Sequence, residues 1–514
     1  MNNKSRTTNS IINSIIGVVS QGSSIILNFV TRLVFVKCLN EEYLGVNGLF
    51  SNILTVLSLA ELGVGTAIIY SLYKPVADKD ELKISALLNY YRKAYQIIGI
   101  IITVLGLLLT PFLNVIIKDQ PDIPNLEFIY VLFLVNTASS YFFAYRRAIF
   151  SADQRESVLL KCRLAFSIIK AILQCVILLT TKNFILFLII QILCTIGENA
   201  LVYYYSDRYY PFIKLNKKIK LDKRDLLKIK NDIKSLMIYK VGSTVLDGTD
   251  NIILSAFVGV VWVGKLSNYT LISGAVSMLA TQIITSITGS IGNFIATEKK
   301  SRYEELLLKI LYLSFIIYGF SFVCLNCLST PFVEMVFGNN YKLDMNIVFV
   351  LSLNFYIFGM MNSIWTFRTT MGLFKYGKYR PLVSAVINVV VSILLAKKIG
   401  MIGVLIGTTI TRVITNVWYD PYIVYKYGLK LSSKKYYFRW MEYLLLSIIS
   451  IFICEFLFKY IMFTGILSFV LKSFVCVFSF VISIFIFTSK QKEFKSLENI
   501  FKNKIQVLND RIHK

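Results

Sequence analysis

Polar side chains recur at every fourth position in one long apolar segment, where Thr408, Arg412, Asn416 and Asp420 follow one another. A spacing of four residues returns side chains to the same face of a helix. A charge at the centre of a membrane-spanning helix costs about 2.5 to 3.5 kcal/mol on insertion scales, so this face needs a polar environment. We expect it either to line water or a bound ligand, or to form a polar seam between helices in which a carboxylate neutralises Arg412.

Arg32 and Lys170 are the other two cations inside long apolar segments. Arg32 follows Ser24 and Asn28 at the same four-residue spacing. It lies near one end of its segment, where a long stem can carry its charge to the lipid headgroups. Lys170 lies near the middle of its segment, too far from either end for its side chain to reach the lipid headgroups. No clear stripe of polar residues at helical spacing accompanies it. A place in a hydrated cavity and a packed place remain open for both residues.

Three carboxylates form the other set of charges inside apolar segments. Glu61 has apolar residues on both sides, and Asp247 and Asp250 lie three residues apart, so that both can face one side of a helix. These acids could form a protonatable or cation-binding site for H⁺ or Na⁺ that couples transport to an ion gradient. Internal salt bridges to the three cations are the alternative.

Groups that usually carry catalysis are scarce in this chain. His513 is the only histidine and lies in the C-terminal tail, which removes histidine-based acyl transfer and histidine metal sites from a membrane active site. No G-x-x-x-x-G-K-[ST] phosphate loop occurs. Cys324 and Cys327 form a C-x-x-C pair in an apolar segment without a partner pair, so we expect ordinary packing. We predict no catalytic residue, no metal site, no bound cofactor and a protein that is not an enzyme.

The elements that carry these residues are long apolar segments. The chain is 56% hydrophobic and 16% charged, which leaves too little polar surface for a soluble core. A helix needs roughly 20 residues to cross a hydrocarbon layer of about 30 Å, and alternating strand patterns are absent. We predict an all-α polytopic membrane protein with about 14 transmembrane helices, near 11–36, 43–73, 84–117, 126–150, 157–181, 183–206, 236–260, 266–296, 306–337, 345–372, 380–396, 400–426, 440–458 and 462–488.

Two recurring tripeptides divide these segments into halves. Thr110-Pro111-Phe112 returns as Thr330-Pro331-Phe332 220 residues later, and Tyr43-Leu44-Gly45 corresponds to Trp262-Val263-Gly264 219 residues later. Both prolines are expected to end their helices at the outer membrane surface. Because each half holds six segments, both copies enter the bilayer in the same direction, as in transporters built from parallel repeats.

The predicted domains follow from this repeat. They are two parallel six-helix lobes at 1–206 and 236–426, a basic cytoplasmic linker at 207–235, two additional transmembrane helices at 427–488 and a basic cytoplasmic tail at 489–514. The outer loops are short, which argues against an enzyme that works on the outer face.

The basic residues are distributed unevenly between the two sides of the membrane. The net charge is +26, and most Lys and Arg residues lie on the side that holds both termini, which the positive-inside rule assigns to the cytoplasm. The linker and the tail are expected to contact anionic membrane lipids, and no nucleic acid partner is predicted. The first apolar segment is too long for a signal peptide and is expected to remain as an anchor.

Four motifs resemble a known family in their order and spacing. They are Ala60–Pro75 (AELGVGTAIIYSLYKP), Asp250–Ser255 (DNIILS), Val263–Ile272 (VGKLSNYTLI) and Trp418–Tyr422 (WYDPY). The sequence resembles bacterial polysaccharide transporters of the Wzx flippase type, which belong to the multidrug/oligosaccharidyl-lipid/polysaccharide (MOP) exporter superfamily. The resemblance runs from about residue 8 to the tail.

This resemblance implies a bundle of six plus six helices that alternates between inward-open and outward-open states. The cargo would be an undecaprenyl-diphosphate-linked oligosaccharide, moved from the cytoplasmic to the outer leaflet of the bacterial cytoplasmic (inner) membrane for capsule, O-antigen or a similar polymer. Partners would be membrane lipids and polysaccharide polymerase or export proteins. Similar lipid II flippases carry a cationic central cavity, but their arginines do not map residue by residue onto this chain.

A diphosphate headgroup gives the intramembrane cations a role. Unpaired ionised groups cost tens of kcal/mol in hydrocarbon in the Born limit, whereas guanidinium and ammonium groups bind phosphate through charge-assisted hydrogen bonds. The predicted diphosphate-binding residues are Arg412, Arg32 and Lys170, the predicted polar lining is Asn28, Thr408 and Asn416, and the predicted ion-coupling residues are Glu61, Asp247 and Asp250.

Two other functions remain open at this point. An ion-coupled multidrug antiporter of the same superfamily moves cations, and a cavity dominated by the three acids would favour it. A membrane polysaccharide polymerase or ligase would need a sizeable outer loop with basic catalytic residues, which the short outer loops disfavour.

Overall fold

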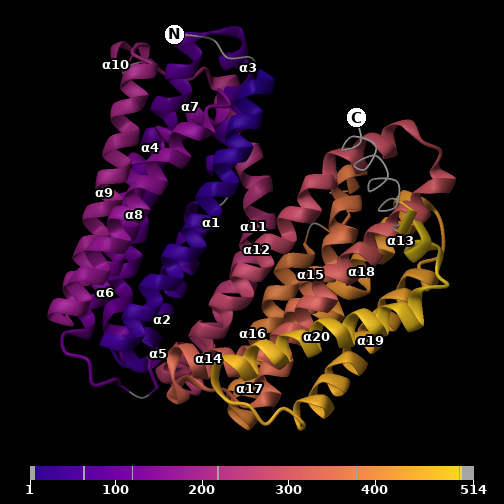
Figure 1. The fold of residues 1–514 in the computed structure, drawn as a ribbon. Helices are drawn as coiled ribbons and strands as arrows, with labels where there is room; N and C mark the ends of the chain where they lie inside the picture. Colours follow the sequence, from indigo (N-terminus) through magenta and orange to yellow (C-terminus); the bar gives the residue numbers. More distant parts are fainter. Residues whose placement is uncertain are drawn as a thin grey trace, which may run out of the picture. The chain divides into compact units, whose positions relative to one another are not determined.

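The computed structural model contains helices and no strands in the residues it describes, which are 6–61, 64–118, 120–216, 219–373, 376–377, 379–496 and 498–499 (Figure 1). This confirms the predicted all-α class. A helix satisfies its backbone hydrogen bonds within one segment, as a hydrocarbon environment requires.

Eleven helical spans among the described residues are long and apolar enough to cross a membrane. They are Ile16–Cys38, Glu81–Ile116, Glu156–Thr181, Phe184–Tyr209, Val260–Thr297, Lys300–Phe337, Met345–Thr370, Arg380–Ile399, Met401–Leu429, Lys434–Phe458 and Gly465–Thr488. Each of them matches one of the apolar segments predicted from the sequence.

The segment that carries Glu61 is broken. It consists of α2 (Glu41–Leu57), a 3₁₀ turn at Ser58–Glu61 and α3 (Val64–Asp78). Neither helix is long enough to count among the eleven spans. A polar break of this kind is tolerated at membrane depth only where neighbouring helices cover it, so the break itself marks a position with a special environment.

Two further predicted segments are helical without reaching the length and hydropathy of the eleven spans. One is α6 (Leu126–Ala144), whose apolar part ends at Phe142. The other lies in the second half of α11 (Lys223–Phe257), which begins inside the predicted basic linker at 207–235.

The first of two compact units holds the residues up to Ser267 together with Pro381–Ala385. Its helix α1 packs on α8, α6 and α8 pack on α9, and α11 packs on α2 and α3. Besides α2, α3, α6 and α11, this unit contains α1 (Arg6–Cys38), α4 (Glu81–Leu109), a 3₁₀ turn (Thr110–Phe112), α5 (Leu113–Ile116), α7 (Arg147–Ala152), α8 (Glu156–Thr181), α9 (Phe184–Tyr209), α10 (Phe212–Leu215) and the start of α12 (Val260–Thr297).

The second unit holds residues 268–380 and the chain from Val386 onward. Helix α14 packs on α15 and α20, α15 packs on α17, and α19 packs on α20. Its elements are the rest of α12, α13 (Tyr303–Ser314), α14 (Phe320–Phe337), α15 (Met345–Thr370), α16 (Arg380–Ile399), α17 (Met401–Arg412), α18 (Tyr419–Ile423), α19 (Lys434–Phe458) and α20 (Gly465–Thr488). One continuous apolar core joins α19 and α20 to the rest of this unit.

This division differs from the lobes proposed from the repeat. The segment from Lys223 to Ser267 belongs to the first unit, because α11 packs on α2 and α3. The lobes at 1–206 and 236–426 are inferred from sequence correspondence and not from contacts, so they stay a prediction.

Two glycines at corresponding places of the repeat contact each other. A Cβ atom added to Gly45 would lie 2.1 Å from the carbonyl oxygen of Val260, and one added to Gly264 would lie 2.4 Å from that of Glu41 and 3.0 Å from the nitrogen of Gly45. The starts of α2 and α12 therefore approach backbone to backbone, as small residues permit between membrane helices.

The two prolines of the repeat do not behave alike. Pro111 lies in the 3₁₀ turn that follows α4, as expected, but Pro331 lies inside α14, which continues to Phe337. The prediction that Pro331 ends its helix is therefore wrong. A proline inside a membrane helix is tolerated where neighbouring groups satisfy the freed carbonyl.

Among the described residues of the second unit, three π-helical turns interrupt the helices. They are Phe315–Gly319 between α13 and α14, Val413–Val417 between α17 and α18, and Val424–Leu429 after α18. A π turn closes hydrogen bonds over five residues, so it changes which side chains share a face beyond it. The second of these turns begins directly after Arg412.

We predict that Gly264→Val destabilises the protein and that Gly274→Val does not. Valine at 264 must displace the Glu41 carbonyl, and overpacking of this kind costs about 1 to 3 kcal/mol. Gly274 lies on the same helix with nothing within 4 Å of its added Cβ. Thermal unfolding of the purified protein in detergent measures the difference, and equal midpoints for the two variants would contradict the close approach.

Candidate substrate-binding and ion-coupling residues

Glu61 lies among tyrosine hydroxyl groups of the first unit. It ends the 3₁₀ turn after α2, and its carboxylate accepts a hydrogen bond from the Tyr95 hydroxyl of α4. Tyr141 of α6 interacts with both Ser58 and Glu61, and the rings of Tyr91 and Tyr95 lie 4.4 Å apart between centroids. One carboxylate thus meets hydroxyl groups from several neighbouring positions.

Gly65, at the start of α3, packs closely against two of these tyrosine hydroxyl groups. A Cβ atom added to Gly65 would lie 3.0 Å from the Tyr95 hydroxyl oxygen and 3.1 Å from that of Tyr91. Carboxylate and hydroxyl oxygens are the ligands that hard cations prefer, and hydroxyl groups can also relay a proton. The arrangement around Glu61 can therefore take up either a proton or a cation such as Na⁺.

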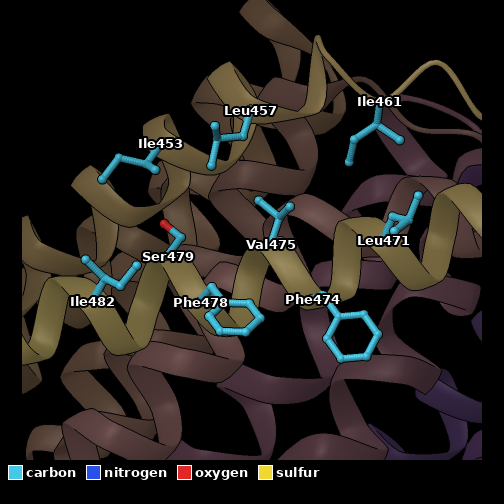
Figure 2. A pocket seen from close by; sticks show the side chains of 9 residues that line it. All are labelled: Ile453, Leu457, Ile461, Leu471, Phe474, Val475, Phe478, Ser479 and Ile482. Atoms are coloured by element: carbon cyan, nitrogen blue, oxygen red, sulfur yellow. The ribbon is translucent and has the colours of Figure 1, made fainter.

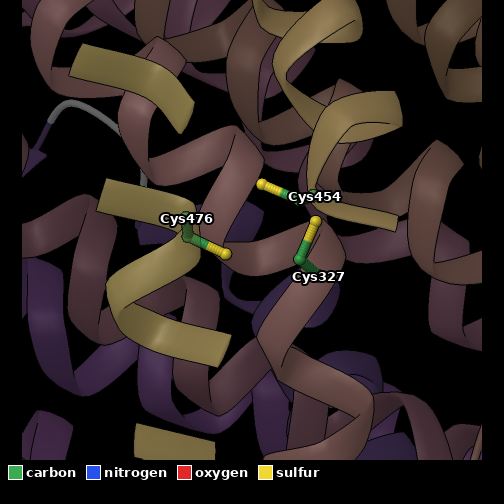
Figure 3. A group of neighbouring side chains, drawn as sticks. All are labelled: Cys327, Cys454 and Cys476. Carbon is green, nitrogen blue, oxygen red and sulfur yellow. The ribbon is translucent and has the colours of Figure 1, made fainter. Parts of the chain in front are cut away.

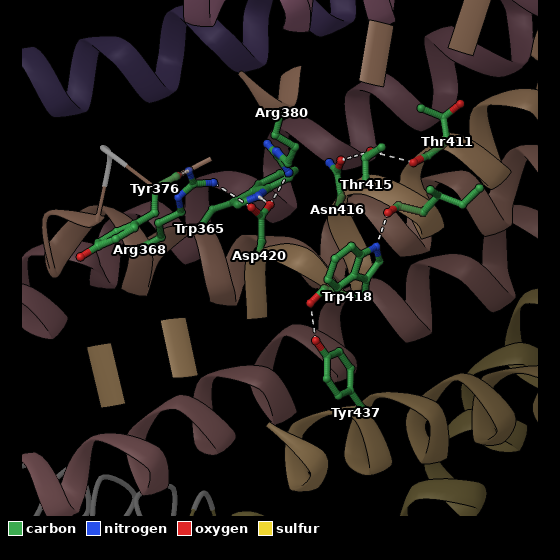
Figure 4. Close-up of polar contacts among 11 residues, drawn as sticks. Trp365, Arg368, Tyr376, Arg380, Thr411, Thr415, Asn416, Trp418, Asp420 and Tyr437 are labelled. Carbon is green, nitrogen blue, oxygen red and sulfur yellow. Dashed lines mark hydrogen bonds and ion pairs between the residues drawn. The ribbon is translucent and has the colours of Figure 1, made fainter. Parts of the chain in front are cut away.

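Asp420 is fully buried in the second unit, where it binds two arginines. Its carboxylate lies 2.7 Å from Arg368 of α15, forms a second ion pair with Arg380 at the start of α16, and accepts a hydrogen bond of 2.8 Å from the indole of Trp365 (Figure 4). Arg368 also donates to the backbone carbonyl of Tyr376. This network joins α15, α16 and α18, and its two cations exceed its one carboxylate.

Arg412 lies against α15. Its guanidinium donates a hydrogen bond of 2.8 Å to the backbone carbonyl of Asn354, and its central carbon lies 5.4 Å from the centre of the Phe358 ring. The side chain is half-buried. The carboxylate in its own polar stripe, Asp420, is bound by other arginines.

The remaining members of that stripe have different surroundings. Thr408 is buried between α16 and α17, where it accepts a hydrogen bond of 3.0 Å from Asn388. Asn416 is half-buried, and its side-chain oxygen accepts a hydrogen bond of 2.8 Å from the Thr415 hydroxyl within the π turn (Figure 4). The four residues from Thr408 to Asp420 therefore do not form one regular helical face, because the π turn after Arg412 shifts the later positions.

The predicted cations of the first unit occupy two helices. Arg32 of α1 is half-buried and donates a hydrogen bond of 3.0 Å to the Ser267 hydroxyl of α12, and Asn28 one turn earlier is exposed. Lys170 of α8 is half-buried, and its ammonium group interacts electrostatically with Glu198 on α9. Glu198 itself forms an ion pair of 2.7 Å with Arg147.

The two aspartates of α11 are described to different extents. Asp250 is half-buried on a helix that also packs against the turn carrying Glu61. The side chain of Asp247 lies outside the described residues. The structure thus places one of these two predicted ion-coupling residues, in the same unit as Glu61.

Several polar groups around these sites have no place in the sequence-based prediction. Tyr95 and Tyr141 read as ordinary aromatic residues of apolar helices, and Arg368 and Arg380 lie at helix ends, where basic residues are common. A carboxylate inside an apolar segment, such as that of Asp420, needs cationic partners. That requirement predicts that some arginine or lysine contacts Asp420, but it does not identify Arg368 and Arg380.

An apolar groove lies between α19 and α20 (Figure 2). Its volume is about 330 Å³, and apart from Ser479 its lining consists of apolar side chains, namely Ile453, Leu457, Ile461, Leu471, Phe474, Val475, Phe478 and Ile482. A groove of this composition fits a hydrocarbon chain, whether that of a membrane lipid or that of a lipid-linked substrate.

Comparison with solved structures shows what class of fold this is. The chain is similar to the lipid II flippase MurJ in an inward closed conformation, with a TM-score of 0.62, 16% identity and coverage of 93% of this chain and 98% of that one. It is also similar to an inward-facing multidrug resistance MATE family transporter of the MOP superfamily, with a TM-score of 0.57, 14% identity and coverage of 79% and 95%.

A MOP superfamily transporter from Pyrococcus furiosus matches with a TM-score of 0.52, 14% identity and coverage of 84% and 98%. No protein-family model matches the sequence, and no curated protein matches it either. The chain therefore has the polytopic membrane fold of MOP superfamily transporters. That fold is shared by a lipid II flippase and by multidrug transporters, so the fold alone does not choose between them.

We predict that Asp420→Asn strongly destabilises the second unit. The substitution leaves Arg368 and Arg380 buried without their carboxylate, and breaking a buried ion pair from one side costs about 3 to 5 kcal/mol. The exposed Asp344 at the start of α15 provides the control, Asp344→Asn.

Thermal unfolding and the yield of folded protein from the membrane are the measurements. Adding Arg380→Gln to Asp420→Asn should recover part of the loss, because it removes one uncompensated charge. An Asp420→Asn variant as stable as Asp344→Asn would show that the network contributes nothing.

Proposed function

We propose that this protein is a flippase that moves an undecaprenyl-diphosphate-linked oligosaccharide from the cytoplasmic to the outer leaflet of the bacterial cytoplasmic membrane by alternating access. The product would feed capsule, O-antigen or similar polymers. The observation that carries this proposal is the apolar groove between α19 and α20, which fits a hydrocarbon chain. The fold likeness to a lipid II flippase, which spans 93% of this chain, agrees with it.

Two helices, α19 and α20, follow the two predicted six-helix lobes. These two helices carry the apolar groove and share the core of the second unit. A carrier of a small soluble cation has no evident use for a groove that fits hydrocarbon, whereas a carrier of a lipid-linked sugar does.

The anionic headgroup supplies the second argument. Arg412 donates a hydrogen bond to the Asn354 carbonyl and Arg32 donates one to the Ser267 hydroxyl, and both side chains are half-buried. A phosphate oxygen would be a stronger acceptor than either. In this proposal the phosphate-binding cation of the second unit is Arg412, with Thr408 and Asn416 as polar neighbours, and those of the first unit are Arg32 and Lys170, with Asn28.

The membrane potential provides a driving force for such a cargo. With the cytoplasm negative, each negative charge carried outward gains about 2.3 kcal/mol per 100 mV. The return of the empty cationic site toward the cytoplasm is favoured by the same field. In this proposal Glu61, with Asp247 and Asp250 of the same unit, adds coupling to H⁺ or Na⁺.

The location and partners belong to the same proposal. Both termini would lie in the cytoplasm, the basic segment at 207–235 would contact anionic lipids, and the polymerase or export proteins of the pathway would receive the cargo. The later part of this segment, from Lys223 onward, begins α11, which also carries Asp250.

A multidrug antiporter is the second candidate, and the structural likeness to a MATE family transporter favours it. The Glu61 cluster would then bind a cationic drug or its counter-ion. Deletion of the gene separates the two functions. The flippase proposal expects loss of the surface polymer with unchanged drug sensitivity, and increased drug sensitivity with intact polymer would favour the antiporter.

We predict that Arg412→Ala abolishes polymer export at normal protein level and that Arg412→Lys retains part of it. Alanine removes the charge that offsets the diphosphate, whereas lysine keeps the charge without the planar fork of donors. Lys398→Ala, at an exposed position on neighbouring α16, serves as the control. Surface polymer in a complemented deletion strain is the readout, and wild-type export by Arg412→Ala would remove this residue from the mechanism.

We predict that Glu61→Gln uncouples export from the ion gradient and that Tyr95→Phe weakens the coupling. Glutamine cannot change its charge, and phenylalanine removes the hydroxyl that donates to the Glu61 carboxylate. Tyr70→Phe and Tyr73→Phe, at exposed positions on α3, are matched controls.

Flipping of a lipid-linked sugar in vesicles with an imposed H⁺ or Na⁺ gradient measures this effect. The wild type should respond to one of the two gradients, and Glu61→Gln should respond to neither. A full response by Glu61→Gln would assign the coupling to another group.

A further inference from the structure

Three cysteines from three different helices meet in the interior of the second unit. Cys327 of α14, Cys454 of α19 and Cys476 of α20 are 5%, 0% and 0% exposed, and their sulfur atoms all lie within 4.8 Å of one another. Figure 3 shows the sulfur atoms turned toward the space between the helices. The chain has only eight cysteines in 514 residues, so a meeting of three is unexpected from their abundance.

A fourth thiol lies close to this group. Cys324 precedes Cys327 by one turn of α14 and interacts with Cys476. The sequence favours packing for the C-x-x-C pair because no partner pair follows it in the same segment. The fold supplies partners from α19 and α20, which are more than 100 residues further along the chain.

The spacing of the three sulfur atoms suits a metal ion. Metal–thiolate bonds of about 2.3 Å place three sulfurs about 4.0 Å apart around a trigonal centre. The observed separations are at most 4.8 Å, so rotation of the side chains by less than about 1 Å at the sulfur closes the site. Soft thiolate ligands select Cu(I) and Zn(II) among the common metal ions.

We propose that Cys327, Cys454 and Cys476 form a binding site for a soft monovalent metal ion of the Cu(I) class. Three sulfur ligands complete the coordination of Cu(I), whereas Zn(II) takes four ligands in structural sites, and the fourth thiol, Cys324, stands outside the group of three.

The site would fasten the two C-terminal helices to the body of the second unit. Helices α19 and α20 are already joined by the Ser450 and Ser483 hydroxyls at 3.0 Å and by the bond of 3.1 Å from Ser479 to the Ser450 carbonyl. Within this group only Cys327 belongs to α14. A bound ion would therefore add a direct link from α14 to both helices, and it would do so whichever substrate the protein moves.

Metal titration of the full-length protein tests this site. The reduced protein, purified in detergent without oxygen, is titrated with Cu(I) in competition with a bicinchoninate chelator, and bound copper is measured by mass spectrometry. We expect one Cu(I) per chain and a raised unfolding midpoint. Cys476→Ser should weaken binding at least tenfold, which is about the lower bound for loss of a supporting group outside the ligand set.

Cysteines buried elsewhere provide the matched controls. Cys162→Ser and Cys194→Ser change buried thiols of the first unit and should leave Cu(I) binding unchanged. X-ray absorption of the copper-loaded wild type should give three sulfur neighbours at about 2.3 Å, a result that does not depend on any variant folding. If Cys476→Ser does not fold, Cys454→Ala takes its place in the titration.

Three results would overturn the proposal. They are binding that Cys476→Ser and Cys454→Ala leave unchanged, preferential binding of Zn(II) over Cu(I), and wild-type protein that binds less than one equivalent because two of the three cysteines form a disulfide. Export of the lipid-linked cargo is not needed for any of these measurements, so they stand or fall apart from the proposed transport function.

Discussion

The cost of placing charge inside an apolar helical bundle governs the polar contacts of this protein. Asp420 is wholly buried, and it is bound by Arg368, Arg380 and the Trp365 indole. Removal of charge from water is repaid only when the partners are close and well oriented. The network consequently fixes α15, α16 and α18 together, and the helices around it owe their arrangement in part to that requirement. Arg412, one π turn earlier in the chain, donates a hydrogen bond to a backbone carbonyl on α15.

Two interruptions of regular helix lie beside candidate charged residues. The 3₁₀ turn between α2 and α3 brings Glu61 to the tyrosine hydroxyls of α4 and α6, and a π turn separates Arg412 from Asp420. Both interruptions change the direction of side chains that a continuous helix would hold on one face. For a transporter with alternating access, such local breaks supply polar backbone and side-chain groups at membrane depth without exposing them to lipid. The flippase mechanism proposed above uses the carboxylate at one break and the guanidinium next to the other.

Much of the architecture could be predicted from hydropathy, but few of the contacts between side chains of different helices could. Apolar runs of spanning length located the helices, because a helix in hydrocarbon needs roughly 20 apolar residues and leaves that length in the sequence. The same patterns predicted a regular polar face from Thr408 to Asp420, which the π turn interrupts, and a helix end at Pro331, which the helix passes through. Local breaks depend on neighbours that satisfy freed backbone groups, and those neighbours are distant in sequence.

The class of the protein, the approximate helix positions and the candidate charged residues could all be predicted, because each follows from composition and spacing within one segment. The contacts between groups became visible only in the folded chain: Tyr95 with Glu61, two arginines with Asp420, and the thiols of Cys327, Cys454 and Cys476. These partners come from different helices, and helix–helix packing is set by the fit of many weakly specific apolar side chains across the bundle. No single segment carries that information, so the meeting points could not be read from the chain alone.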